Sequence, residues 1–396
     1  MLEVKENYLM NDYRNHIGII GGGISGLTLG CSLLKEGIPA IIFEKMPEET
    51  SHGAAISLSL NALRILDMLD IYTDLKDQSF IHSSASIQGP LKEISAFKTP
   101  EVLTTSRQTL MSLLYSRYIN LGGEILHHHD LANFDEVKCE ATFTNKNKYI
   151  LKHIAACDGI RSSIRDTFFA ANQYPKYSGY SAWRGIGKSD LQKIHFALGP
   201  DSHIVSYPIN KGGDVSFVAV RKEDYQFKES WKEKGSISDL LNDFSIYDPK
   251  IFPELEDSMP IYKWGIYIRP PLKSMIAKNI TLLGDAAHPM VPFLGQGACM
   301  AIEDAYSFAM ACKEKIVNLR DAQEAYNFVR NKRTKKIQRL SMMQGKIYHM
   351  KNPLLVSVRN AVMKYTNIPG NDLKRIHDYD AYNEMQIYLA LGDLRA

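Results

Sequence analysis

The chain has 396 residues, of which 45% are hydrophobic and 23% charged, and its formal net charge is +3 at pH 7. This length exceeds that of one ordinary hydrophobic core, so we expect two closely packed domains. The composition is that of a folded globular protein and not of a disordered one. A net charge of +3 is too small to predict nucleic-acid binding.

The cysteines and the hydropathy pattern indicate a cellular compartment. The five cysteines have no close pair and no repeating spacing, which favours reduced thiols over a disulfide framework. There is no run of 18 apolar residues, and residues 1–16 are polar and mixed in charge, unlike a signal peptide. We therefore predict a cytoplasmic protein without an integral membrane segment.

A glycine motif follows the first apolar run. Residues 17–20 are typical of a buried strand, and Gly21, Gly23 and Gly26 then have the G-x-G-x-x-G spacing before a helical pattern. A second apolar run, residues 40–43, ends at Glu44, at the distance expected of an acid that binds a ribose. The motif predicts an adenine-dinucleotide site but does not distinguish FAD from NAD. We assign to it Gly21, Gly23, Ser25, Gly26, Glu44 and Lys45.

The next segments add predicted helices and strands to this unit. Residues 61–69 and 106–121 have helical periodicity, and the second helix carries Arg107 at its start, within reach of a phosphate. Residues 80–98 suggest paired strands, and residues 124–126, 140–143 and 149–156 read as strands. The last of these is followed by Asp158 and Gly159, at the carboxyl end of a strand, where ligands collect in open α/β sheets.

Residues 175–265 have a different character. Aromatic residues are frequent, and alternating runs are separated by glycine turns, so that residues 204–209 are expected to pair with residues 215–220. We predict a mostly antiparallel second domain. Along residues 202–208, His203, Val205 and Tyr207 share one face. Periodicity leaves open whether this face or the opposite one points to the ligand.

A second glycine site appears late in the chain. Residues 279–283 read as a buried strand that delivers Asp285, and Gly295, Gly297 and Ala298 begin another helix. Two separated helix N-termini suit a dinucleotide with two anionic parts. FAD fits better than NAD, because a helix N-terminus can stabilise the negative charge of the reduced flavin.

Three segments together resemble a known family: residues 21–26, residues 157–162 and residues 283–289. They look like the single-component FAD-dependent aromatic hydroxylases, the group A flavoprotein monooxygenases of the p-hydroxybenzoate hydroxylase fold. The likeness covers nearly the whole chain and is strongest to the salicylate, 3-hydroxybenzoate and 6-hydroxynicotinate hydroxylase branch. It implies an α/β fold, in which a Rossmann-like FAD-binding domain is interleaved with a mostly antiparallel substrate domain and followed by C-terminal helices.

The resemblance also implies an activity. NADH or NADPH would reduce the flavin, O2 would form a flavin C4a-hydroperoxide, and a small aromatic or heteroaromatic substrate would be hydroxylated. Two alternatives stay open: a FAD-dependent epoxidase or tailoring hydroxylase acting on a larger polycyclic compound, and a flavin-binding sensor without turnover.

The resemblance carries over site residues one by one. Besides the first motif, Arg107, Asp158 and Asp285 would contact the cofactor, and residues 292–297 would line the flavin ring. Some relatives carry glutamine where this chain has Pro292, so a glutamine-assisted step is not assumed. The catalytic candidates are His203, Tyr207 and Pro292. The substrate-binding candidates, each of which could also be plain packing, are Trp183, Arg184, Phe217, Pro292 and Phe293.

The remaining expectations concern organisation and surface. We expect an FAD-binding domain of residues 16–80, 101–174 and 266–320, a substrate domain of residues 81–100 and 175–265, and a helical region of residues 321–396. The His127, His128, His129 run is expected to bind no metal, since neighbouring strand side chains point to opposite faces. The chain would be a monomer or homodimer. We interpret the late basic residues as a solvated helix face: Arg330, Lys332, Arg333, Lys335, Lys336 and Arg339.

Overall fold

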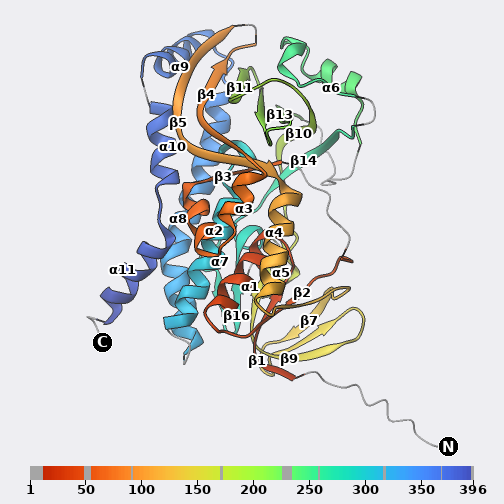
Figure 1. Cartoon of the computed structure of the whole chain (residues 1–396), viewed down its shortest axis with the longest axis vertical. Helices are drawn as coiled ribbons and strands as arrows, with labels where there is room; N and C mark the ends of the chain where they lie inside the picture. The colour runs from red at the N-terminus through yellow and green to blue at the C-terminus, as the bar shows by residue number, and fades with distance from the viewer. Residues whose placement is uncertain are drawn as a thin grey trace, which may run out of the picture.

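The computed structural model of the chain describes residues 12–48, 55–90, 92–169, 173–224, 234–256, 259–314, 318–366 and 368–393. Residues 1–11, on which the prediction of no signal peptide partly rests, lie outside this set. Within it are two sheets of eight strands each and the helices that cover them. Figure 1 places one sheet in the lower half of the molecule and the other in the upper half, with helix α8 (Leu319–Tyr348) running beside both.

The first sheet contains the predicted dinucleotide strands. Its central strands are parallel, in the order β16, β9, β1, β2 and β6, and shorter antiparallel strands extend its β9 and β16 sides. All residues of β2 are buried, as its apolar sequence predicts. The bounds are β1 (Asp12–Ile20), β2 (Ala40–Phe43), β6 (Glu124–Leu126), β7 (Leu131–Asp135), β8 (Glu140–Phe143), β9 (Lys148–Ala156), β15 (Ile276–Ala277) and β16 (Ile280–Leu282).

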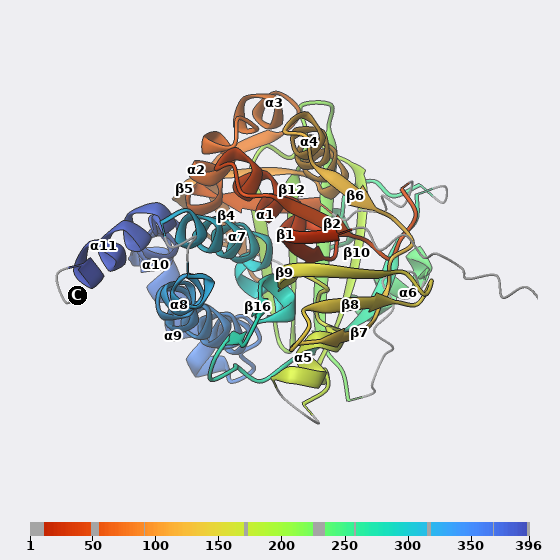
Figure 2. The ribbon, with the colours of Figure 1, turned by 90° about the horizontal axis from the view of Figure 1, so that it is seen from below.

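Helices cover this sheet. Figure 2 shows β6, β2, β1, β9 and β8 side by side, with α1 (Ile24–Lys35) and α7 (Gly297–Glu314) together on one side. Helix α4 (Arg107–Asn120) begins as its sequence predicts, because the Ser106 hydroxyl accepts the Thr109 N–H at 2.9 Å. The shorter helices are α2 (Leu60–Met68), α3 (Tyr72–Asp77) and α5 (Ser163–Phe168).

The second sheet is mostly antiparallel, as predicted. Its order is β14, β10, β13, β12, β11, β4, β5 and β3, and within it only β11 and β4 pair in parallel. The expected hairpin forms between β12 and β13, where Asn210 Oδ1 accepts the Gly212 N–H at 2.9 Å and Gly213 has a φ of +82°. The bounds are β3 (Ala55–Ser59), β4 (Phe80–Gln88), β5 (Glu93–Ser106), β10 (Lys176–Lys188), β11 (Ile194–Gly199), β12 (Ser202–Pro208), β13 (Asp214–Lys222) and β14 (Tyr262–Ile268).

The two faces of the second sheet have different partners. On the outer face, Trp183, Ile204 and Phe217 form a core with Leu240 and other residues of the segment that contains α6 (Ile237–Asp243) and the short helix η1 (Pro249–Ile251). On the inner face, a second core joins strands β10, β13 and β14 to the segment that precedes α7. Its members are Ala182, Val220, Trp264, Ile266, Val291 and Phe293.

The C-terminal part is helical, as expected. After α8 come α9 (Pro353–Tyr365), α10 (Ile368–His377) and α11 (Ala381–Asp393). Strands β3 and β5 belong to the second sheet, so residues 55–59 and 93–106 are part of it. The division of the chain into domains by residue number stays a prediction. None of the described helices has the length and apolarity needed to span a membrane.

The interpretation of the late basic residues as one solvated face is wrong for two of them. Lys332, Lys336 and Arg339 are exposed, but Arg330 is 0% exposed and the Arg333 side chain is 11% exposed. The reason is that α8 turns Arg330 and Arg333 toward acidic residues of α7. Their function is described below.

Candidate active site

Three strand ends meet at one edge of the first sheet. The last residue of β9, Ala156, pairs with Ile20 of β1 on one side and with Leu282 of β16 on the other. Because these strands are parallel, the residues after each strand end lie next to one another. The fold therefore brings together the predicted residues Gly21, Asp158 and Asp285, which the sequence separates by more than 100 residues.

The first glycine site has the geometry of an anion site. Gly21 has a φ of +104°, and a Cβ there would lie 2.5 Å from the Cys157 carbonyl oxygen; a Cβ at Gly26 would lie 1.9 Å from the Gly21 carbonyl oxygen. At Gly23 no atom of the described structure lies within 4 Å of such a Cβ. Gly23 caps α1 without a side-chain hydrogen bond, so the first amides of α1 are directed at this open position.

Glu44 is fixed by the backbone around it. Its Oε2 accepts the Gly22 N–H at 2.6 Å, and its Oε1 accepts the Met46 N–H at 2.8 Å. The half-buried carboxylate therefore lies beside the glycine loop and keeps lone pairs for further donors. Ser25 is buried in the first turn of α1, and Lys45 is exposed next to Glu44.

The second glycine site repeats this arrangement. Gly284 and Gly295 have φ values of +58° and +63°, and at Gly297, the first residue of α7, no atom lies within 4 Å of an added Cβ. Asp285 lies in the short helix η2 (Gly284–Ala286). Although part of its side chain is exposed, desolvation by protein atoms raises the pKa of Asp285, and the charges of His288 and Arg107 offset part of that rise.

Asp158 faces the same edge. One of its oxygens, Oδ1, is buried and accepts no hydrogen bond from the residues that the structure describes. Burial raises the pKa of Asp158 to about 6, and Ser162 with the backbone amides that follow opposes the rise. A buried oxygen without a donor is costly for the protein alone. It points to a hydrogen-bond donor on a ligand.

A buried ion network holds the second site in place, and it was missed in the sequence. Asp304 of α7 accepts the Gly284 N–H at 3.0 Å through Oδ2, which also bonds His288 Nε2, while Arg330 Nε donates to Oδ1 at 2.8 Å. Burial alone would raise the pKa of Asp304, but His288 and Arg330 lower it to about 2. A charged carboxylate therefore ties η2 to α7 and α8.

Glu303 extends the network to the loop before α7. Its carboxylate accepts bonds from Arg330, Arg333 and Asn61, and Asn61 Nδ2 also donates to Gln296 Oε1 at 3.1 Å. Glu303 and Asp304 are both 0% exposed. Two adjacent acids within an otherwise small and apolar helix are the signal in the sequence that could have revealed this network.

Arg184 connects the second sheet to the site. Its guanidinium lies 5.0 Å from the Trp264 ring centroid and 5.4 Å from that of Tyr262, on the inner face. Desolvation and then the charge of Arg107 lower the pKa of Arg184 to about 10. The charges of Arg107 and Asp285 also affect each other's pKa, so Arg107 relates Arg184 electrostatically to the second glycine site.

His203 lies on the inner face as well. Directly opposed residues of antiparallel strands share a face, and His203 is opposite Val220, which is opposite Ala182. The ring of His203 is 5.3 Å from the Phe293 ring, centroid to centroid, and its Nδ1 is 2.6 Å from Nε2 of His349, the residue that follows α8. Burial lowers the pKa of His203, and burial lowers that of His349 to about 4, so both rings are neutral at pH 7.

The fold does not bring all the predicted residues together. Trp183 and Phe217 are buried on the outer face, and the thickness of the sheet separates them from Arg184 and His203. Tyr207 shares the inner face but packs with β4 and β11, and burial raises the pKa of its phenol to about 12. Pro292 is exposed in η3 (Pro292–Leu294), next to Phe293. Ala298 is half-buried in the first turn of α7.

The histidine run follows β6 and lies next to Glu44, whose carbonyl oxygen accepts the His129 N–H at 2.9 Å. His127 Nδ1 bonds the Met46 carbonyl, His128 is exposed with a φ of +59°, and His129 Nε2 is 3.0 Å from the Tyr149 hydroxyl. Among the described residues, no group of three or more His, Cys, Asp or Glu is arranged to hold a metal ion.

Comparison with known proteins decides the family. The profile of a family described as FAD binding domain matches residues 14–337, most of the chain. The chain belongs to this FAD-binding family. Similar proteins include 3-amino-4-hydroxybenzoate 2-monooxygenase PtnB3 of Streptomyces platensis, 27% identical over 86% of this chain and 90% of that protein. A 3-hydroxybenzoate 6-hydroxylase of Polaromonas naphthalenivorans is 26% identical over 84% and 87%, and a salicylate hydroxylase of Pseudomonas putida is 25% identical over 86% and 87%.

Solved structures support the same fold. A salicylate hydroxylase in complex with its substrate matches with a TM-score of 0.80 and 21% identity, over 95% of this chain and 98% of that one. HpxO of Klebsiella pneumoniae, complexed with FAD and uric acid, matches with a TM-score of 0.81 and 19% identity, over 92% and 96%. These structures confirm the predicted fold class, and the family match together with the sequence relatives confirms the FAD-dependent monooxygenase class.

The residues present fit FAD. The open position at Gly23 and the uncapped start of α1 suit the diphosphate, and the carboxylate of Glu44 beside them suits the ribose hydroxyls. The unpartnered Oδ1 of Asp158 lies just after the end of β9, and the open position at Gly297 is at the first residue of α7. The assignment of each residue to a part of FAD stays a prediction.

Two glycine variants should separate folding from cofactor binding. We expect Gly23→Ala to fold with the stability of the wild type, because its methyl group meets no protein atom, but to bind FAD at least tenfold more weakly, because the methyl group occupies the diphosphate position. Gly26→Ala should destabilise the fold itself. Thermal unfolding of the apoprotein and titration with FAD measure the two effects; unchanged FAD affinity in Gly23→Ala would contradict the assignment.

The ion network should be essential to the fold. Asp304→Asn leaves Arg330 buried with one anionic partner fewer, and we expect a loss of about 3–5 kcal/mol in the free energy of unfolding. Asp321→Asn, at an exposed position of α8, should change it by less than about 0.5 kcal/mol. Chemical denaturation of both variants checks this. Equal stability of the two would show that the network contributes nothing measurable.

Proposed function

We propose that this flavoprotein hydroxylates a small aromatic or heteroaromatic acid, using O2 and NADH or NADPH. The names of its relatives support the substrate class: they act on aminohydroxybenzoate, 3-hydroxybenzoate and salicylate. When bound, the flavin supplies the redox chemistry, accepting electrons from the nicotinamide and activating O2. The residues of the chain bind, orient and shield the reactants.

The observation that carries this proposal is the pair of arginines where the two sheets meet. Arg184 comes from the second sheet and Arg107 from the start of α4, and after desolvation the charge of Arg107 further lowers the pKa of Arg184. Asp285 compensates part of the charge of Arg107, and the positive charge of the pair still favours an anion beside Arg184. A substrate carboxylate bound by Arg184 meets this requirement, with the Trp264 and Tyr262 rings holding the guanidinium in place.

His203 is proposed as the acceptor for the proton of a ring hydroxyl. Its strand, β12, lies two strands from β10, which carries Arg184, so the two backbones are about 10 Å apart, enough for one aromatic ring between the side chains. Because burial lowers its pKa, the ring is neutral and can accept a proton. His349 bonds its Nδ1 and so fixes the orientation of the ring.

The apolar residues of the inner face have a separate task. Val291 and Phe293, before α7, pack against Trp264 and Ile266 of the second sheet and are at most 6% exposed. They close the junction between the two sheets on one side. Exclusion of water there would protect the activated oxygen from release as peroxide.

Arg184 is tested with matched acids and amides. For wild-type protein we expect a hydroxybenzoate to accelerate NADH or NADPH oxidation and to appear as product with one oxygen added by mass. Arg184→Gln should raise the KM for the acid at least tenfold and leave the response to the corresponding hydroxybenzamide unchanged, because the amide carries no charge.

Arg221→Gln is the matched control, because Arg221 lies on the outer face, paired with Asp243. If Arg184→Gln affected acid and amide equally, the role of Arg184 in carboxylate binding would be wrong. If no aromatic compound accelerated NADH or NADPH oxidation by FAD-loaded wild-type protein, the hydroxylase proposal itself would fail.

His203 is tested by the pH dependence of turnover. In the wild type the rate should be nearly constant from neutral to mildly alkaline pH, because a base of lowered pKa is already deprotonated there. In His203→Gln the rate should fall at least tenfold at pH 7 and rise with pH toward the pKa of a free phenol, about 10. His195→Gln, on the opposite face of the same sheet, should behave like the wild type. A pH profile of His203→Gln parallel to that of the wild type would exclude the role of base.

A further inference from the structure

Helix α9 carries an exposed apolar face. Its sequence supplies Leu, Val and Tyr side chains at positions that recur with the helical period on one side, which we call the α9 outer face. Their exposed fractions, and that of the first residue of α10, are 73% for Leu354, 53% for Leu355, 55% for Val358, 37% for Val362, 77% for Tyr365 and 50% for Ile368.

The α9 outer face is not needed to hold α9 against the rest of the protein. The opposite side of the helix is anchored by Met363, which is 7% exposed, and by Arg359, whose Nη1 donates to the Ile347 and Tyr348 carbonyl oxygens at 3.2 and 3.1 Å. Asn352 caps the helix by accepting the Leu354 and Leu355 N–H groups. The helix is thus formed and docked without its outer face, and contiguous exposed apolar surface of this kind marks an interaction site.

Basic residues flank this face in the sequence. Residues 325–371 contain no Asp or Glu. On α8, which leads into α9, the exposed residues Lys332, Lys336, Arg339 and Lys346 follow one side of the helix. On α9 itself, Lys364 is exposed beside Tyr365, its Nζ 5.4 Å from the ring centroid. Lys351, before α9, is paired with Asp201.

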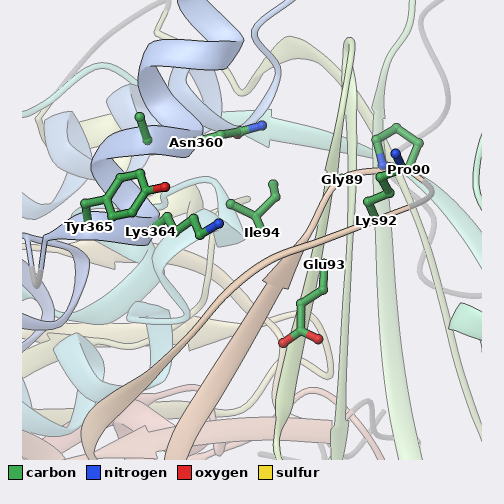
Figure 3. A pocket seen from close by; sticks show the side chains of 9 residues that line it. Gly89, Pro90, Lys92, Glu93, Ile94, Asn360, Lys364 and Tyr365 are labelled. Carbon is green, nitrogen blue, oxygen red and sulfur yellow. The ribbon is translucent and has the colours of Figure 1, made fainter.

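A pocket of about 620 Å³ adjoins the α9 outer face at Tyr365. Figure 3 shows Asn360, Lys364 and Tyr365 of α9 on one side and residues of the β4–β5 hairpin on the other, with Ile94 between. Its rim is polar, with Lys92, Lys364 and the carboxylate of Glu93, and its lining includes Ile94, Pro90 and Ala361. Helix α9 thus has apolar side chains on its outer face and the Lys364 ammonium group beside this pocket.

We propose that the α9 outer face docks on the surface of an anionic lipid bilayer. Leucine, valine and tyrosine on one side of a helix, with lysines flanking them, is the pattern of helices that lie in the bilayer interface. The lysine stems can reach along apolar surface while the ammonium groups meet lipid phosphates. The helix would lie on the membrane and not cross it, in agreement with the hydropathy of the described helices.

A second copy of the chain fits this face less well. Helix α9 has 13 residues, so it is about 20 Å long and about 10 Å wide, a footprint of about 200 Å², against about 800 Å² that a standard interface buries on each partner. A copy related by two-fold symmetry would also bring equal positive charges face to face, which is unfavourable. An anionic bilayer supplies opposite charge and has no such limit of area.

The test is sedimentation of FAD-loaded protein with phosphatidylcholine vesicles, with and without phosphatidylglycerol. We expect binding only to vesicles that contain phosphatidylglycerol, weakened by salt. Val358→Asp should reduce binding at least tenfold, and Lys364→Glu by at least about fivefold, since each lysine near an anionic surface contributes about 1 kcal/mol. Ile119→Asp, on the exposed side of α4, is the matched control and should bind like the wild type.

Several results would overturn the proposal. They are no sedimentation of wild-type protein at low salt, loss of binding by Ile119→Asp equal to that by Val358→Asp, or a change of Val358→Asp from dimer to monomer by analytical ultracentrifugation with vesicle binding intact. The last would show that a second copy covers the face. Val358 is exposed, so its variant should keep its FAD and thermal midpoint; if it does not fold, Lys364→Glu alone decides. The assay needs no turnover, so it is independent of the proposed activity.

Discussion

The parallel pairing of β9 with both β1 and β16 is the constraint on which the site depends. It aligns three strand ends, so that Gly21, Asp158 and Asp285 come from distant parts of the chain to one edge of one sheet. Two of these positions carry a cost that a bound cofactor would repay: Asp158 has a buried carboxylate oxygen without a donor, and desolvation raises the pKa of Asp285. Such local costs are typical of sites built to bind a ligand.

The buried charges of α7 and α8 give that edge its rigidity. Asp304 holds the backbone of Gly284, and Glu303 reaches Gln296 through Asn61, so one pair of adjacent acids positions both loops of the second glycine site. Arg330 and Arg333 compensate the two acids, and Arg333 also lies over the Tyr379 ring at 3.8 Å. Helix α8 is thereby part of the support of the second glycine site, since an uncompensated charge at this depth would be costly.

The two faces of the second sheet have different roles. The outer face packs into a hydrophobic core, and the inner face carries the residues proposed to bind the substrate. Alternation along β10 places Trp183 in the outer core and Arg184 on the inner face, although the residues are neighbours. The same alternation places His203 and Tyr207 on the inner face, and within that face the fold separates them, because His203 meets Phe293 and His349 while Tyr207 packs with β4 and β11. The α9 outer face belongs to neither sheet. Its proposed role is to hold the protein on a bilayer surface, and this role is independent of the reaction.

The sequence by itself determined the elements and the cofactor class. Glycine spacing and apolar runs are local signals, so the parallel strands of the first sheet, the hairpin of β12 and β13, and the FAD class followed from short segments. Only the tertiary structure decided which face of β12 points inward, that Trp183 and Phe217 pack away from Arg184, and that Arg330 and Arg333 are buried ion partners. The physical reason is that a side-chain period shows which residues share a face, whereas the partner of that face depends on how distant elements pack.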